Sequence, residues 1–265
     1  MRGRRADVDL AAYVPGWTPW LADRVKPSTA DSYLAHVRTL MPAEAPFYRS
    51  QFTAPAVAQW LATRPSLSGS TKRHYLAGLQ RFAAYLVEIG MLPTNPLRDV
   101  TAPPANPPRC VFLELPDVRR VVEGALLPFR AIYALAYGAG LEISAILALV
   151  DADVNAPGRE VRARGTKAWT RDRIARVADW AWPHVQAHLD TLLPGERLFR
   201  GISRRAAGDV HRERLKALGL PHHHLHDSRH HWAVRMVRAG MPLELVARQL
   251  GHRDVVMVAR VYGRF

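Results

Sequence analysis

The sequence predicts a mainly helical protein with a small β-hairpin or sheet, organised as two domains. Apolar residues recur three and four positions apart along most of the chain, which is the pattern of amphipathic helices. Only residues 158–164 and 173–178 alternate enough to be strands. Residues 101–109 hold four prolines and cannot continue a helix. We therefore expect an extended linker there, between a helical domain at 1–100 and a second domain at 110–265.

Four helices are expected in the first domain, each from an apolar stripe at helical spacing. The second follows Pro27, with Ser28 as its predicted cap, and the fourth follows Ser68 and ends before Gly90. The four stripes are Trp17, Trp20 and Leu21; Tyr33, Leu34 and Val37; Ala56, Val57, Trp60 and Leu61; and Tyr75, Leu76, Leu79, Phe82, Ala83, Leu86 and Val87.

The net charge of +14 favours a polyanionic partner such as DNA. Residues 1–105 hold 12 basic and 7 acidic residues, and residues 106–265 hold 25 and 16, so both halves are basic. This is expected if both bind one duplex, although a generally basic surface gives the same balance. Lys72, Arg73 and Arg81 lie opposite the apolar stripe of the fourth predicted helix. They suit a DNA backbone, or form a solvated basic face.

The second domain is expected to combine the hairpin with several helices. Before its C-terminal part, these helices begin at Leu115, run from Ala131 to Tyr137 and from Glu142 to Leu149, and lie at about 181–193 and 203–218. The longest uncharged apolar run, residues 131–141, is too short to span a bilayer. Cys110 is the only cysteine, which excludes an intrachain disulfide and fits a reducing cytoplasm.

The last forty residues are predicted to form three short helices. The first begins near His226 and ends at Gly240-Met241-Pro242, and the second ends at Gly251. The third covers residues 255–261 and carries Tyr262 at its end. These helices should bring side chains from separate parts of the segment into one region.

Those side chains have complementary chemistry. Arg229 presents a rigid fork of donors to an anionic phosphate. His226 and His252 can hold or pass a proton near neutral pH, and Tyr262 can be a nucleophile in covalent catalysis. Together they suit attack on a phosphodiester. Each also has an ordinary structural explanation, such as a helix-capping His226 or a core Tyr262.

The order H-x-x-R at His226 to Arg229, then L-G-H ending at His252, then Tyr262 ten residues later resembles the C-terminal signature of the tyrosine recombinase (phage integrase) family. The resemblance implies a helical core-binding domain and a mixed α+β catalytic domain that close as a clamp around DNA. It also implies a homodimer on inverted half-sites of double-stranded DNA, assembling to a homotetramer during strand exchange. No membrane partner is expected.

The same resemblance implies roles for these side chains in site-specific cleavage. Arg229 would hold a non-bridging phosphate oxygen. His226 and His252 would hydrogen-bond the phosphate and help the tyrosine lose its proton. Tyr262 would form a 3′-phosphotyrosyl link that conserves bond energy for rejoining. No metal or other cofactor is needed, because cations and hydrogen bonds stabilise the transition state.

Lys167 lies at the tip of the predicted hairpin in a chain with 33 arginines and only four lysines. Lysine can give up a proton in a catalytic step, whereas arginine stays protonated. In the family a hairpin lysine in a G-x-K setting protonates the 5′-oxygen leaving group, and Gly165-Thr166-Lys167 resembles it. Alternatively, Lys167 contacts only the DNA backbone, as we expect of Arg164, Arg171 and Arg173.

One position departs from the family pattern. The family's first arginine lies in a G-L-R-I-S-E-L-like helix start, but residues 140–146 read G-L-E-I-S-A-I, with Glu142 in the place of that arginine. Losing one preorganised donor typically costs about 2.7–4 kcal/mol of transition-state stabilisation. Activity is therefore weak, the site is rearranged, or the protein binds specific DNA sequences without cutting them. The arginines that could take the role of the missing arginine are Arg162, Arg164, Arg171 and Arg235.

Two further alternatives concern the chemistry of this region. A topoisomerase-like DNA relaxer would use the same phosphotyrosyl intermediate. A metal site is suggested by His222, His226 and His230, which would align on one helix. However, Pro221 and the predicted helix start near His226 interrupt that helix, and no cysteine lies nearby, so no metal site is predicted.

Overall fold

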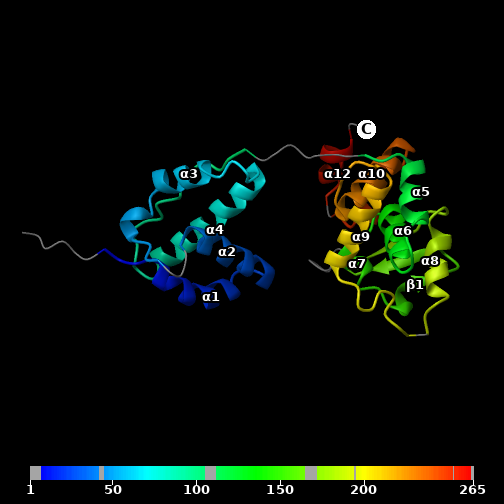
Figure 1. Ribbon diagram of the computed structural model, residues 1–265, viewed down its shortest axis with the longest axis horizontal. Coiled ribbons are helices and arrows are strands. Elements are labelled where there is room, and N and C mark those ends of the chain that lie inside the picture. The colour runs from blue at the N-terminus through cyan, green and yellow to red at the C-terminus, as the bar shows by residue number, and fades with distance from the viewer. Residues whose placement is uncertain are drawn as a thin grey trace, which may run out of the picture. The chain divides into compact units, whose positions relative to one another are not determined.

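The structure, a computed structural model, describes residues 7–41, 45–104, 112–164, 172–193, 195–252 and 254–263. Over these residues the protein is mainly helical with a three-stranded sheet, so the predicted fold class is confirmed. The chain divides into two compact units, Met1–Pro108 and Arg109–Phe265 (Figure 1). Much of the predicted linker, from residue 105 onward, lies outside the described residues, as does the hairpin tip with Lys167 and Arg171.

The first unit packs four α-helices around an aromatic and aliphatic core. Trp17 and Phe82 are fully buried and meet edge to face, with ring centroids 5.1 Å apart. Ser68 caps the longest helix, since its side chain accepts a hydrogen bond from the Thr71 amide. The helices are η1 (Ala11–Tyr13), α1 (Val14–Ala22), α2 (Pro27–Leu40), η2 (Arg49–Gln51), α3 (Ala54–Ala62) and α4 (Gly69–Glu88).

The cap predicted at Ser28 is wrong. The N-cap of α2 is Lys26, and Pro27 is the first helical residue. Proline suits that position because its φ is already helical and its missing N–H is not needed there. Ser28 consequently lies inside the first turn, where its carbonyl accepts a hydrogen bond from the Ser32 hydroxyl.

The second unit is built around α6 (Phe129–Ala139), whose residues from Ala131 to Ala139 are all buried. Helices α5, α7, α8, α9 and α10 all contact it (Figure 1). The other helices are α5 (Leu115–Glu123), α7 (Ile143–Ile146), η3 (Asp151–Asp153), α8 (Trp182–Leu189), α9 (Arg204–Ala217), η5 (Leu225–Asp227), α10 (Ser228–Arg238), α11 (Leu243–Leu250) and α12 (Val255–Tyr262).

Gly140 ends α6 and could not be another residue without rearrangement. Its φ is +67°, and a Cβ there would lie 2.8 Å from the Trp232 ring. Helix α6 therefore continues through Gly138 and Ala139, beyond its predicted end at Tyr137. The helix predicted from Glu142 to Leu149 is shorter than expected. Glu142 is the N-cap of the four-residue α7, and Leu147 is its C-cap.

The sheet is antiparallel with strand order β1 (Val154–Asn155), β2 (Glu160–Ala163), β3 (Arg173–Arg176). Val161 pairs with Ala175 and both are fully buried. The neighbouring Arg162 and Ile174 are exposed and point to the other face. The two predicted strands are thus confirmed, while β1 is too short to produce a recognisable alternating pattern.

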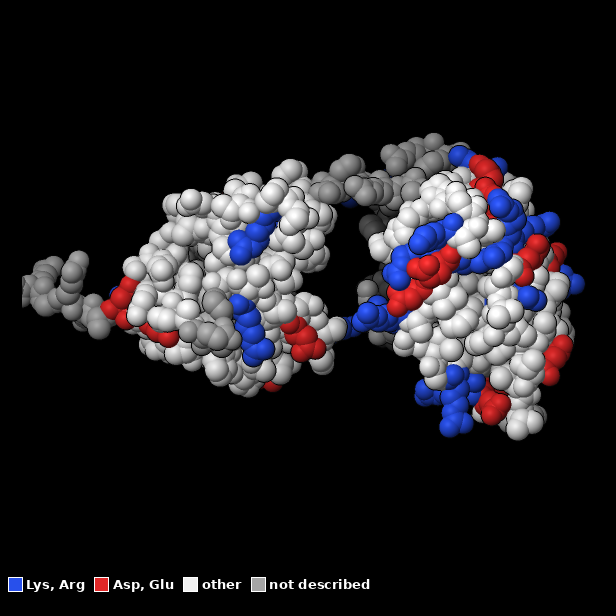
Figure 2. Space-filling model, viewed as in Figure 1, with Lys and Arg blue, Asp and Glu red and all other residues white. Residues whose placement is uncertain are grey.

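The three C-terminal helices α10, α11 and α12 begin and end close to the predicted residues. They share a separate apolar cluster that includes Trp232, Val246, Leu250, Val258 and Tyr262. No helix within the described ranges is long and apolar enough to cross a membrane. Lysine and arginine side chains are visible on the surface of each unit in Figure 2, with acidic groups among them.

Candidate active site

Arg229 lies in the first turn of α10 and is 5% exposed. Its Nη1 donates to the Gly140 carbonyl at 3.3 Å, and its Nη2 donates to the Leu250 carbonyl and to His252 Nε2, the latter at 3.2 Å. Both carbonyls lie at helix C-termini, where carbonyls have no partner within the helix and carry partial negative charge. The ends of α6 and α11 therefore fix the guanidinium in place.

Glu142 faces the same guanidinium. Its Oε1 is 3.8 Å from Arg229 Nη1, and both side chains are largely buried. The residue at the position of the missing family arginine thus forms an ion pair with the arginine that is present. An incoming phosphate would meet this carboxylate as well as the cation.

His252 follows Gly251, whose φ of +69° ends α11 and turns the chain. An arginine can only donate hydrogen bonds, so His252 Nε2 acts as the acceptor in its contact with Arg229. A neutral His252 therefore carries its proton on Nδ1.

Tyr262 is the last residue of α12 and is 3% exposed. Its hydroxyl forms a hydrogen bond with Nδ1 of His230, and the two ring centroids are 5.7 Å apart. His230 directly follows Arg229 on α10, so this contact joins the tyrosine to the helix that holds the arginine. His226 is exposed in the turn η5, with its ring 6.1 Å from that of His230.

The sequence did not single out His230 as a partner of the tyrosine. It was considered only as one of three evenly spaced histidines, although its position next to Arg229 could have drawn attention to it. Burial lowers the pKa of His230 below its usual value, and His226 also lowers it while Asp227 raises it. His230 is therefore mainly neutral at pH 7 and can accept a proton.

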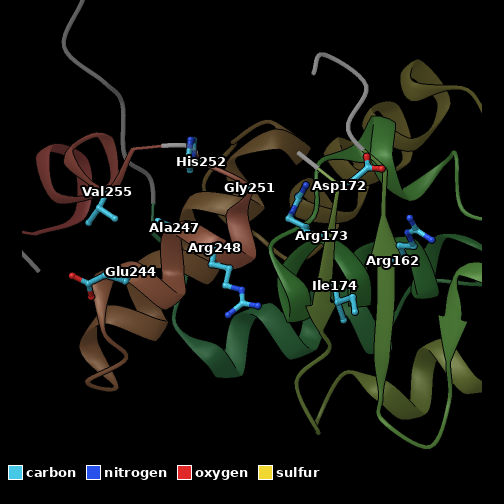
Figure 3. A pocket seen from close by; sticks show the side chains of 10 residues that line it. All are labelled: Arg162, Asp172, Arg173, Ile174, Glu244, Ala247, Arg248, Gly251, His252 and Val255. Carbon is cyan, nitrogen blue, oxygen red and sulfur yellow. The ribbon is translucent and has the colours of Figure 1, made fainter. Parts of the chain in front are cut away.

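A basic cavity of about 670 Å³ lies between the sheet and α11 (Figure 3). Arg173 Nε donates to the Gln249 carbonyl at 2.5 Å, which holds this side chain against the end of α11. His252 also lines the cavity. Because His252 contacts Arg229, it connects the cavity to that arginine. The charged or titratable lining residues are Arg162, Arg173, Arg248 and His252, together with Asp172 and Glu244. Such a lining suits a phosphate group.

The arginines proposed to replace the missing one differ in their surroundings. Arg162 lines the cavity, and Arg171 lies outside the described residues. Arg164 forms an ion pair with the buried Asp153 at 2.9 Å. Arg235 donates to the Tyr137 carbonyl, and burial lowers its pKa to about 10. Both Arg164 and Arg235 thus have structural partners.

The other predicted DNA contacts lie in the first unit, on α4. Arg73 and Arg81 are exposed and Lys72 is half-buried, so all three can reach solvent. Arg73 Nη1 also donates to the Pro103 carbonyl at 3.4 Å. These positions are compatible with contact to a polyanion.

The histidine-rich segment does not place His222, His226 and His230 on one helix, the arrangement that a metal site would have required. His222 precedes the turn η5, His226 lies in it, and His230 is in α10. Among the described residues, no group of three or more histidine, cysteine, aspartate or glutamate side chains is arranged to hold a metal ion.

Comparison with known proteins agrees with this fold and identifies the family of the chain. The model of the phage integrase family matches residues 123–264. The chain is 25% identical over 208 residues to tyrosine recombinase XerC of Vibrio parahaemolyticus, covering 72% of this chain and 66% of that protein. It is 28% identical over 221 residues to XerC of Haemophilus influenzae, covering 76% and 74%. The chain thus spans about two thirds to three quarters of these relatives.

Solved structures share the fold at low sequence identity. The Tn1549 transposon integrase in complex with transposon right end DNA superposes with a TM-score of 0.76 at 16% identity, covering 96% of this chain and 95% of that one. A lambda integrase dimer bound to a COC′ core site superposes with a TM-score of 0.79 at 15% identity, covering 97% of this chain and 77% of that one. The fold and the sequence match define the same class, that of the tyrosine recombinases. The chain belongs to the phage integrase family.

Proposed function

We propose that the protein is a site-specific recombinase or integrase that binds double-stranded DNA and cleaves and rejoins its strands through a 3′-phosphotyrosyl intermediate. The observation that carries this proposal is the contact between the Tyr262 hydroxyl and His230, the residue next to Arg229. Arg229 in turn contacts His252, which lines the basic cavity. The nucleophile on α12 therefore contacts α10, the short helix that carries the phosphate-binding cation.

In the proposed reaction the Tyr262 oxygen attacks phosphorus while Arg229 holds a non-bridging oxygen. The bond from phosphorus to the 5′-oxygen breaks, and Lys167 supplies the proton to that oxygen. His226 and His252 hydrogen-bond the phosphate. Attack by a 5′-hydroxyl on the phosphotyrosine reverses these steps and rejoins a strand. The charge on the phosphate is balanced by side chains and needs no metal ion.

We propose further that the first unit contacts DNA through Lys72, Arg73 and Arg81, and the second through Arg164, Arg171 and Arg173. The related structures include a lambda integrase dimer on a core site and a tetramer bound to a Holliday junction. By analogy, this protein would bind inverted half-sites as a dimer and assemble as a tetramer during strand exchange. It would act in the cytoplasm, where its DNA is accessible.

A nicked duplex that traps the covalent intermediate tests this proposal, once the cognate site has been selected from random DNA. Wild type should form a protein–DNA adduct that resists denaturation. Tyr262→Phe should form none while still shifting the DNA in a gel, and Tyr48→Phe, at an exposed tyrosine of the first unit, should behave as wild type. Relaxation of a plasmid that lacks the site would instead indicate a topoisomerase-like enzyme.

The second candidate function is a DNA-binding protein that has lost cleavage, and the Glu142–Arg229 pair favours it. Specific binding by wild type without any adduct would support this candidate. If the site is otherwise ordinary, Glu142→Arg should increase the rate of adduct formation, because it removes a carboxylate that faces the phosphate and adds a cation. An unchanged or lower rate would mean that another arginine has taken over this role.

A further inference from the structure

We propose that His230, and not His226 or His252, is the general base that removes the phenolic proton of Tyr262. The inference rests on the proposed function, since it assigns a residue to the cleavage step. It makes His230 a catalytic residue, because its Nδ1 touches the oxygen that attacks phosphorus.

The first argument is geometric. A general base must lie within hydrogen-bond reach of the proton that it removes. His230 Nδ1 is hydrogen-bonded to the Tyr262 hydroxyl, and the tyrosine side chain is almost fully buried around that contact. When His230 carries its own proton on Nε2, Nδ1 is the acceptor and the hydroxyl donates to it.

The second argument concerns the other two histidines. His252 Nε2 already accepts a hydrogen bond from Arg229, so that lone pair is directed at a cation. His226 is exposed, and its ring lies perpendicular to that of His230 at 6.1 Å. Both histidines are therefore better suited to contacting the phosphate.

The third argument is the charge state of the site. Among the described residues, the titratable and charged groups that face His230 are His226 and Asp227 from η5, Arg229 from its own helix and Tyr262 from α12. Burial lowers the pKa of His230, and the Arg229 cation also opposes a charge on its ring, while Asp227 favours one. The imidazole is neutral before cleavage, and a phosphate bound at Arg229 would stabilise the imidazolium that forms.

The step balances without another reactant. The proton of Tyr262 moves to His230 Nδ1 as the oxygen–phosphorus bond forms and the bond to the 5′-oxygen breaks. Lys167 gives a proton to the departing oxygen. During rejoining the 5′-hydroxyl loses its proton to Lys167, and His230 returns its proton to the tyrosine oxygen.

Single-turnover adduct formation on the nicked duplex tests this assignment with His230→Asn. Asparagine keeps an acceptor oxygen near the position of Nδ1 but cannot take up the proton. The rate at pH 7 should fall by about 10²–10⁴-fold and should rise with pH, because the phenol must then ionise unaided. His230→Gln should show the same loss. His222→Asn, at an exposed histidine before η5, is the matched control and should keep the wild-type rate.

A duplex with sulfur in place of the bridging 5′-oxygen separates the base from the acid. Sulfur leaves without being protonated, so this substrate should restore cleavage by Lys167→Ala but not by His230→Asn. If this substrate also restored cleavage by His230→Asn, His230 would be the acid that protonates the departing oxygen, and the proposal would be overturned. A wild-type or faster rate for both His230 variants would also overturn it, because the contact would then only restrain the tyrosine. Absence of an adduct from wild type would instead contradict the proposed function itself.

Discussion

The two units of this protein differ in what they bury. The core of the first unit is aromatic and aliphatic, with Trp17, Phe52 and Phe82 at its centre. In the second unit the interior also contains polar and charged side chains. Within the described residues, every buried polar or charged side chain lies there: Asp153, His188, His211, His223, Ser228, Arg229 and His231.

Such groups are costly to bury unless each finds a partner. The Tyr137 hydroxyl bridges Nε2 of His211 and Nε2 of His223, at 2.8 and 2.6 Å. His223 Nδ1 donates to the Pro221 carbonyl at 3.1 Å, so its Nε2 accepts from the tyrosine, and the tyrosine oxygen accepts from His211. The Leu113 amide donates to His231 Nδ1 at 2.9 Å. His231 lies on α10, the helix that carries Arg229, and its ring contacts those of His223 and Tyr137, so the polar interior supports the candidate active site.

Acidification should produce the largest difference in stability between the two units. Burial lowers the pKa of His211 and of His231 to about 3, below the value of about 6.5 in an unfolded chain. The unfolded state therefore binds protons first. The stability that these two neutral histidines contribute is fully present above about pH 6.5. It falls as the pH drops towards 3, by up to about 1.4 kcal/mol per pH unit for each histidine.

Urea unfolding at pH 7.5 and pH 5 measures this difference in stability, when hydrogen exchange of peptides from each unit is followed by mass spectrometry. The second unit should lose several-fold more stability than the first. In the first unit burial also lowers the pKa of His36, which is only partly buried, so a smaller loss is expected there. Equal losses in both units would contradict the contrast between the two interiors.

Phe82→Ala should destabilise the first unit by about 3–5 kcal/mol, because it leaves a cavity in a fully packed core. Phe82 is fully buried and contacts Trp17 and Phe52. The loss should be the same at pH 7.5 and pH 5, since no titrating group is involved. Gln59→Ala on the exposed face of α3 is the control and should change stability by less than about 0.5 kcal/mol. Urea unfolding measures both variants.

Tyr137→Phe should destabilise the second unit by about 1–3 kcal/mol, because His211 and His223 both lose their shared partner. Tyr133→Phe is a matched control on the same buried helix. Its hydroxyl makes a hydrogen bond to the Ala207 carbonyl at 3.2 Å, so its removal should cost less. If the two variants cost the same, the histidine network does not contribute as described. Thermal unfolding of the second unit at pH 7.5 measures the difference.

The sequence predicted the helices well where apolar stripes end at glycine or proline. Gly251 and Pro242 delimit α11, for example, and Ser68 marks the start of α4. Boundaries were less accurate where tertiary packing decides them. Gly138 does not interrupt α6, since the helix is buried on all sides. Glycine is needed at this position because a Cβ would collide with Ala181.

The candidate site was predicted only in part. The nearness of Arg229 to His252 was expected from the resemblance, but the carbonyls of Gly140 and Leu250 that hold the guanidinium belong to helix ends that no periodicity connects. The contact between His230 and Tyr262 likewise joins residues of two helices through their side chains. The role of Lys167 stays a prediction, since it lies outside the described residues.

The most direct test of this account is to identify the residue that becomes linked to DNA. The trapped adduct on the nicked duplex can be digested with trypsin and nuclease, and the modified peptide sequenced by mass spectrometry. We predict a 3′-phosphonucleotide on the oxygen of Tyr262. A nucleotide on any other side chain, or specific binding by wild type with no modified peptide at all, would contradict it.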